Sequence, residues 1–157
     1  MMRSRSRMNK KTALMYAVDL LARQEQSEKR LREKLQRKGY EEAEIEAAVA
    51  RLHEKHYLSD EEACQRQFDY LYRESRSSVR QICLKLQQRG FEGSLVRQCV
   101  PSDTFQREQR AALKNLSLKF KPSADPQKML ASLYRQGFDT SVCREAVAEY
   151  AAEVEEE

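Results

Sequence analysis

The chain of 157 residues is poor in the residues that build tight turns: it has 4 glycines, 3 prolines and no tryptophan. Average usage would give roughly eleven glycines and eight prolines in a chain of this length. β-Sandwiches and β-barrels need many such turns and are poor candidates. The composition instead favours helices, and we expect an all-α fold without strands.

The chain also lacks long hydrophobic runs and closely spaced cysteines. Its apolar stretches are a few residues long, whereas a membrane helix needs about 20, and no apolar segment follows the basic N-terminus as in a signal peptide. No C-x-x-C pair suggests a zinc or redox site. We therefore expect a cytoplasmic protein that has reduced thiols and does not associate with membranes. The cysteines are Cys64, Cys83, Cys99 and Cys143.

Motifs for phosphate binding, nucleophilic catalysis and zinc-dependent proteolysis are absent from the sequence. We therefore expect no enzyme activity, no cofactor and no metal. His53 and His56 are three residues apart and could share a metal with Glu54 or Asp60. Surface histidines near a helix C-terminus, where positive charge suits the helix dipole, are the simpler interpretation.

Three glycines, Gly39, Gly90 and Gly137, mark an internal repeat. An aromatic residue follows each of them, and apolar residues recur eight and four positions before each glycine and six and ten positions after it. A left-handed glycine followed by a hydrophobic residue is typical of a helix C-terminus. The pattern predicts an elongated array of three tandem three-helix repeats, about nine helices in all.

Local signals suggest where the parts of the array begin. Ser59 and Glu62 form a capping box, and Asp125 before Pro126 is typical of a helix start. We predict a basic disordered tail at residues 1–10, repeats at 11–58, 59–101 and 102–152, and an acidic tail at 153–157.

Basic residues are the strongest indication of a binding surface. The net charge is +4, and residues 1–60 hold 14 basic against 10 acidic residues. Arg30, Lys34 and Arg37 form a helical stripe before Gly39, and recurrence of basic residues on neighbouring repeats would make a continuous band suited to phosphates or acidic side chains. The candidate binding residues are Arg23, Arg30, Arg32, Lys34, Arg37, Lys38, Arg76, Arg80, Lys85, Arg89, Lys119 and Arg135.

Five tyrosines near these residues could stack on nucleic-acid bases. At helical spacing such residues more often belong to the core. They are Tyr40, Tyr57, Tyr70, Tyr72 and Tyr134.

Three segments resemble the RecX regulatory protein family, and the similarity covers about residues 11–150. They are the run Arg23-x-x-x-Ser27-Glu28-x-x-Leu31-Arg32-x-Lys34-Leu35, the joint Tyr57-Leu58-Ser59-Asp60, and Leu133-Tyr134-Arg135-Gln136-Gly137-Phe138. One segment departs from the family pattern: Ser75-Arg76-Ser77-Ser78-Val79-Arg80 stands where family members commonly carry a joint that contains glycine.

The resemblance implies a curved, modular regulator that binds the RecA recombinase in the groove of the RecA–single-stranded DNA filament. Such a protein acts in DNA repair, homologous recombination and the SOS response. We expect it to inhibit the ATPase, strand-exchange and coprotease activities of RecA. The alternative is the opposite effect, in which it stabilises the RecA filament. The expected partners are the RecA filament and its single-stranded DNA, with weak direct DNA binding, and the protein is expected to be a monomer. A helical DNA- or RNA-binding protein acting without RecA, or a scaffold for another protein, would also fit the residues alone.

Overall fold

The computed structural model describes residues 11–156, which form helices and no strand. The predicted all-α fold is confirmed. The predicted basic tail at residues 1–10 and the terminal Glu157 lie outside the described residues. In the described part of the chain, no helix is both long and apolar enough to cross a membrane.

Contacts divide the chain into two compact units. Unit 1 runs to Cys64 and includes the short segment Arg89–Phe91. Unit 2 comprises Gln65–Gln88 and the chain from Glu92 onward. The helix α5 (Asp60–Glu74) begins in unit 1 and continues in unit 2.

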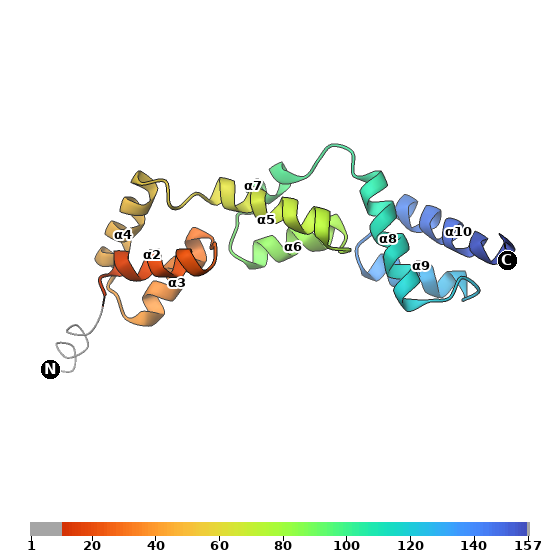
Figure 1. Ribbon diagram of the computed structural model, residues 1–157, viewed down its shortest axis with the longest axis horizontal. Helices are drawn as coiled ribbons and strands as arrows, with labels where there is room; N and C mark the ends of the chain where they lie inside the picture. The colour runs from red at the N-terminus through yellow and green to blue at the C-terminus, as the bar shows by residue number, and fades with distance from the viewer. Residues whose placement is uncertain (1–10, 157) are drawn as a thin grey trace. The chain divides into compact units, whose positions relative to one another are not determined.

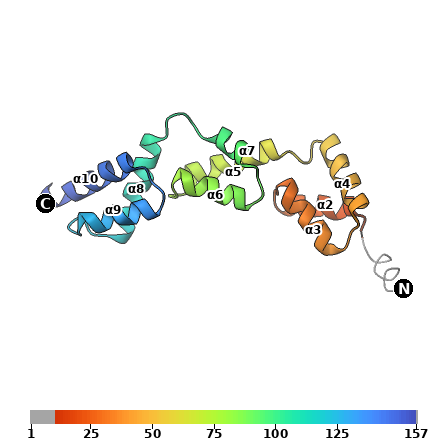
Figure 2. The same ribbon diagram turned by 180° about the vertical axis from the view of Figure 1, so that it is seen from behind.

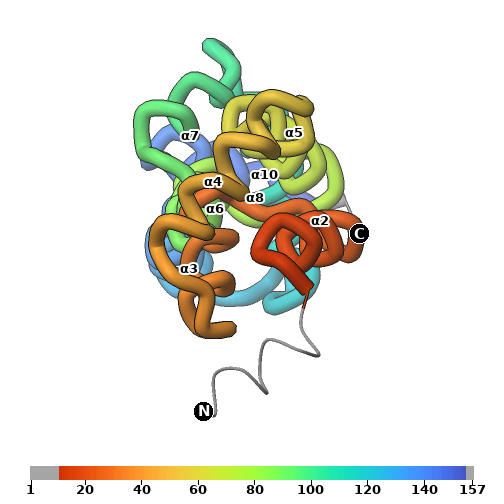
Figure 3. Tube along the Cα trace, turned by 90° about the vertical axis from the view of Figure 1, so that its left-hand side faces the viewer, coloured from red at the N-terminus to blue at the C-terminus, as the bar shows by residue number. Residues whose placement is uncertain are grey.

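Unit 1 is built from α2 (Ala13–Arg23), α3 (Glu28–Lys38) and α4 (Glu42–Glu54), which pack side by side (Figures 1 and 3). The apolar residues of each helix recur at helical spacing and face a common core. Ser59 Oγ accepts a hydrogen bond from the Glu62 N–H at 3.3 Å, as expected for the start of α5. The core consists of Ala17, Leu20, Leu31, Leu35, Ile45, Val49, Leu52 and Leu58.

Unit 2 contains α6 (Val79–Gln88), α7 (Gly93–Cys99), α8 (Phe105–Lys119), α9 (Pro126–Arg135) and α10 (Thr140–Glu156), seen from behind in Figure 2. Helix α9 starts as predicted, because the Asp125 side chain accepts from the N–H of Gln127 and proline occupies the first turn. Helices α8, α9 and α10 share a core that includes Leu116, Met129 and Leu133.

The three repeat glycines adopt the left-handed conformation that the sequence predicts, with φ of 105°, 101° and 92° at Gly39, Gly90 and Gly137. Of the fifteen matching apolar positions, all are buried except Tyr40 and Val100, which are half-buried. Three helices begin in each predicted repeat range. The repeat boundaries themselves stay a prediction, and α10 continues through residues 153–156 of the predicted acidic tail.

Candidate partner-binding surface

A buried serine at the start of α3 ties two segments of unit 1 together. The residue Ser27 is only 1% exposed. Its Oγ atom accepts a hydrogen bond from the Arg30 N–H at 3.2 Å and donates one to the Arg89 carbonyl at 2.6 Å. The N–H of Glu28, the first residue of α3, donates to the Asp60 carboxylate at 2.8 Å. Two of the N–H groups that a helix N-terminus leaves unpaired are thus satisfied, and the serine also holds a distant carbonyl.

The same arrangement occurs in unit 2. Ser78 Oγ accepts from the Gln81 N–H at 3.2 Å and donates to the Gln136 carbonyl at 2.6 Å. The Val79 N–H donates to the Glu108 carboxylate at 3.1 Å. A serine, a backbone carbonyl and a carboxylate therefore form a repeated joint, which we call the serine joint.

The register of the two serine joints is the same. Ser27 and Ser78 each stand twelve residues before a repeat glycine, and each binds the carbonyl just before the next repeat glycine along the chain. Asp125 occupies the equivalent position before Gly137 and caps α9. This spacing is a signal that the sequence carries, although only the structure shows what the two hydroxyls bind.

Close packing at the serine joints explains two of the repeat glycines. A Cβ atom at Gly90 would lie 2.5 Å from Ser27 Oγ, and one at Gly137 would lie 2.9 Å from Ser78 Oγ. A Cβ atom at Gly39 would meet nothing within 4 Å. Residues 90 and 137 are therefore glycine for two reasons. The backbone there is left-handed, and a side chain would collide with the serine hydroxyl.

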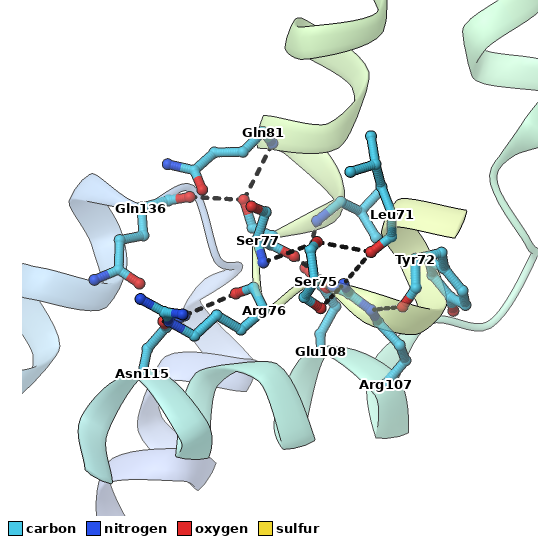
Figure 4. Close-up of polar contacts among 12 residues, drawn as sticks. Leu71, Tyr72, Ser75, Arg76, Ser77, Gln81, Arg107, Glu108, Asn115 and Gln136 are labelled. Atoms are coloured by element: carbon cyan, nitrogen blue, oxygen red, sulfur yellow. Dashed lines mark hydrogen bonds and ion pairs between the residues drawn. The ribbon is translucent and has the colours of Figure 1, made fainter. Parts of the chain in front are cut away.

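Arg107 of α8 holds the segment between α5 and α6, which the sequence singled out because it lacks glycine. Its guanidinium donates to the carbonyls of Tyr72, Ser75 and Ser77 at 2.8, 2.9 and 2.6 Å, and to the Glu108 carboxylate at 2.6 Å (Figure 4). The side chain is only 11% exposed. A cation at this place satisfies carbonyls that the last turn of a helix leaves unpaired.

Most of the predicted basic residues are exposed, but not all. Arg32, Lys34 and Arg89 are half-buried. The exposed ones are Arg23, Arg30, Arg37, Lys38, Arg76, Arg80, Lys85, Lys119 and Arg135. The continuous band across all three repeats stays a prediction.

Arg32 is engaged within the protein. Its Nε atom donates to Glu28 at 2.9 Å, and its Nη1 atom pairs with Glu46 of α4. Glu28 also contacts His53 Nε2 at 2.7 Å. Burial on its own raises the pKa of the Glu28 carboxyl, but the hydrogen bonds with His53 and Arg32 outweigh it and hold that pKa below its ordinary value. The positive charge of Arg32 is therefore balanced inside unit 1.

Three other predicted residues also have internal contacts. The Lys38 ammonium lies 5.2 Å from the centre of the Tyr16 ring. Lys119 Nζ donates to Ser132 Oγ at 3.3 Å, and Arg76 Nε donates to a side-chain oxygen of α8 at 2.7 Å. One contact of this kind leaves most of the N–H groups of a lysine or arginine available to a partner.

The serine joints bring basic residues together within each unit. A Cβ atom at Gly90 would lie 3.2 Å from the Cβ atom of Lys29, so Arg89 lies beside the basic start of α3. A Cβ atom at Gly137 would lie 3.3 Å from the Cβ atom of Arg80, which places the N-terminus of α6 beside the basic last turn of α9. Lys29 was not among the binding residues predicted from the sequence.

The candidate stacking tyrosines separate into two groups. Tyr57, Tyr70 and Tyr134 are 62%, 59% and 44% exposed. Tyr40 and Tyr72 are half-buried: the Tyr40 hydroxyl donates to the backbone at 2.5 Å, and the Tyr72 ring lies under the Arg107 guanidinium at 4.9 Å. Only the first three rings are open to a base.

The two histidines lie near the end of α4. His53 contacts Glu28, and His56 takes a φ of 60° just beyond the helix. Over residues 11–156 no group of three or more histidine, cysteine or carboxylate side chains is arranged to hold a metal ion.

Comparisons with known proteins identify the relatives of this chain. Residues 13–52 match the family model described as RecX, first three-helix domain. The regulatory protein RecX of Vibrio parahaemolyticus is 32% identical over 127 residues, which cover 78% of this chain and 81% of that protein. The regulatory protein RecX of Syntrophotalea carbinolica is 29% identical over 134 residues, or 80% and 88% of the two chains.

A solved structure shows the same fold. The crystal structure of RecX from Lactobacillus salivarius superimposes with a TM-score of 0.76 at 16% identity, covering 88% of this chain and 94% of the other. The family resemblance seen in the sequence is thereby confirmed by curated relatives over most of their length. This chain belongs to the RecX family of regulatory proteins.

Proposed function

We propose that this protein binds the filament that RecA forms on single-stranded DNA and inhibits its ATPase, strand-exchange and coprotease activities. The observation that carries the proposal is membership of the RecX family, whose members compared above are named regulatory proteins. The exposed basic residues support it, because both DNA phosphates and acidic protein side chains bind such residues.

Within unit 1, α3 is the element best suited to this contact. Arg30 and Arg37 are exposed on one stripe, with Lys34 half-buried between them. Each exposed ion pair is expected to contribute about 0.2–1 kcal/mol, so affinity would depend on several contacts together. Salt would weaken such binding because it screens exposed charges. Arg32 is expected to contribute less, since two glutamates already balance its charge.

The test is ATP hydrolysis by RecA on single-stranded DNA, titrated with this protein at two salt concentrations. We expect inhibition at protein levels too low to coat the DNA, and weaker inhibition at the higher salt. A triple variant, Arg30→Glu, Lys34→Glu and Arg37→Glu, should abolish inhibition while circular dichroism stays unchanged.

A matched control reverses three exposed charges elsewhere, with Arg97→Glu, Lys121→Glu and Arg144→Glu. This variant changes the net charge equally and should still inhibit RecA. Equal loss in both variants, or full inhibition by the α3 variant, would contradict the assignment to α3. A native protein that binds DNA tightly without inhibiting RecA would contradict the proposed function and favour direct nucleic-acid binding.

A further inference from the structure

Unit 2 contains an open cavity of about 1260 Å³ beside the segment that Arg107 holds. Its walls come mainly from the end of α5, the segment of residues 75–77 and the first three turns of α8. Figure 4 shows this region, with Arg107 and Asn115 rising from α8 and Gln136 facing Arg76.

Exposed cationic side chains converge on the cavity. Arg76, Arg110 and Lys114 all line it and are exposed. Arg110 and Lys114 are one turn apart on α8, and their cationic ends make no hydrogen bond or ion pair with the residues that the structure describes. The Nε atom of Arg76 donates to Asn115 at 2.7 Å, which orients the guanidinium and leaves its terminal N–H groups for a ligand.

The carboxylates in the same walls are already engaged. Asp69 accepts from the Gln65 amide at 2.8 Å, and Glu74 pairs with Arg73 at 3.4 Å. Asp103 accepts from a backbone N–H at the start of α8 at 3.1 Å. The cations that line the cavity, Arg73, Arg76, Arg107, Arg110 and Lys114, outnumber these three carboxylates, so the lining keeps a net positive charge.

The cavity has no apolar anchor site. Of the described residues that line it, the apolar ones are Ala111, which is 6% exposed, and Tyr72, whose ring is covered by Arg107. Protein partners usually dock through buried aromatic or aliphatic anchors. Nucleic-acid interfaces are more polar and more positively charged. The lining therefore favours a phosphate backbone over an acidic protein segment.

We propose that this cavity, which we call the backbone groove, binds the phosphodiester backbone of single-stranded DNA through Arg76, Arg110 and Lys114. The choice of single-stranded DNA rests on the proposed function. One guanidinium group can donate two parallel hydrogen bonds to two oxygens of the same phosphate. Contacts to the DNA backbone carry no sequence information. Binding in the groove is therefore independent of DNA sequence. Arg107 does not touch the DNA but positions the segment that carries Arg76.

The test is direct binding of the full chain to a fluorescent single-stranded oligonucleotide without RecA, followed by anisotropy at several salt concentrations. For single strands, each phosphate contact contributes about 0.7 to the slope of log affinity against log salt. The variant Arg76→Gln, Arg110→Gln, Lys114→Gln should therefore bind more weakly, with a slope smaller by about 2. The double variant Arg110→Gln, Lys114→Gln keeps the Arg76 contact with Asn115. Its slope of log affinity against log salt should be smaller than that of the native protein by about 1.4.

A control variant, Arg97→Gln, Lys121→Gln and Arg144→Gln, removes the same charge from exposed residues outside the groove. Its slope should match that of the native protein. Equal losses in groove and control variants would overturn the proposal, because general charge would then explain the binding. Failure of the native protein to bind the oligonucleotide would overturn it as well.

RecA assays on the same variants separate this inference from the proposed function. A groove variant that binds DNA normally but no longer inhibits RecA would show that the groove contacts protein, which overturns the inference and leaves the proposed function intact. A groove variant that loses DNA binding supports the inference, even if the native protein fails to inhibit RecA and the proposed function is wrong.

Discussion

Alanine at the three left-handed glycines is expected to destabilise the protein by unequal amounts. The left-handed backbone costs a residue with a Cβ atom about 1–2 kcal/mol. Alanine recovers about 0.4–1 kcal/mol of this, because it restricts the unfolded chain. At Gly39 no atom lies within 4 Å of the added Cβ, so Gly39→Ala should cost about 1 kcal/mol in all.

At Gly90 the serine joint adds a second cost. The new Cβ atom would lie 2.5 Å from Ser27 Oγ, so the hydroxyl must turn away and lose its 2.6 Å hydrogen bond to the Arg89 carbonyl. A lost hydrogen bond that leaves a buried polar group unpaired costs about 1–3 kcal/mol. Gly90→Ala should therefore cost about 2–4 kcal/mol, with Gly137→Ala between the two because its contact is 2.9 Å.

Urea unfolding followed by circular dichroism measures these costs, and a double-mutant cycle tests their cause. Ser27→Ala removes the Oγ atom, and the Cβ atom that stays is 3.5 Å from the new one, an ordinary contact. In that background Gly90→Ala should cost about 1 kcal/mol, a coupling of about 1–3 kcal/mol.

Gly39→Ala is the matched control for this cycle. Gly39 lies at the opposite end of α3 from Ser27, about 18 Å away at 1.5 Å per residue. The changes in unfolding free energy caused by Gly39→Ala and Ser27→Ala should therefore be additive. Equal costs at Gly39 and Gly90, or an additive Ser27–Gly90 cycle, would refute the reasoning.

Two further predictions concern charged groups. Arg107→Gln should cost about 3–5 kcal/mol, because it leaves Glu108 buried without its charged partner. Arg107→Lys keeps a cation beside Glu108 but lacks the planar fork that reaches several carbonyls, so it should cost less than Arg107→Gln and still destabilise the protein. Urea unfolding measures both, and a harmless Arg107→Lys would contradict this role. The pKa of Glu28 lies below its ordinary 4.5, so its stabilisation is complete above that pH and is lost as the pH falls through the folded-state pKa. Acid titration of stability should therefore be shallower in Glu28→Gln than in the native protein, and identical curves would contradict the assignment.

Much of the fold was predictable because its signals are local. Apolar residues at helical spacing marked the buried faces of α2 to α4, and the glycines marked helix ends, because only neighbouring residues decide these features. Asp125 before Pro126 located the start of α9 for the same reason. The repeat pattern and the family motifs then identified the fold and the family.

The candidate surface was predictable only in part. A basic stripe on α3 follows from residue spacing, and Arg30 and Arg37 are exposed as expected. The engagement of Arg32 did not follow, because one of its partners, Glu46, lies fourteen residues away on another helix. Arg110 and Lys114 were not among the residues predicted from the sequence, although Lys119 of the same helix was. They became candidates because the structure places them beside Arg76 in one cavity.

The helices, the caps that begin them and the glycines that end three of them follow from the sequence alone, because each depends on residues close together in the chain. Which polar groups meet depends on the tertiary structure. Ser27 and Ser78 bind carbonyls 62 and 58 residues away, and Arg107 binds carbonyls about 30 residues before it. Such pairs depend on how the helices pack, and no local pattern of residues specifies them.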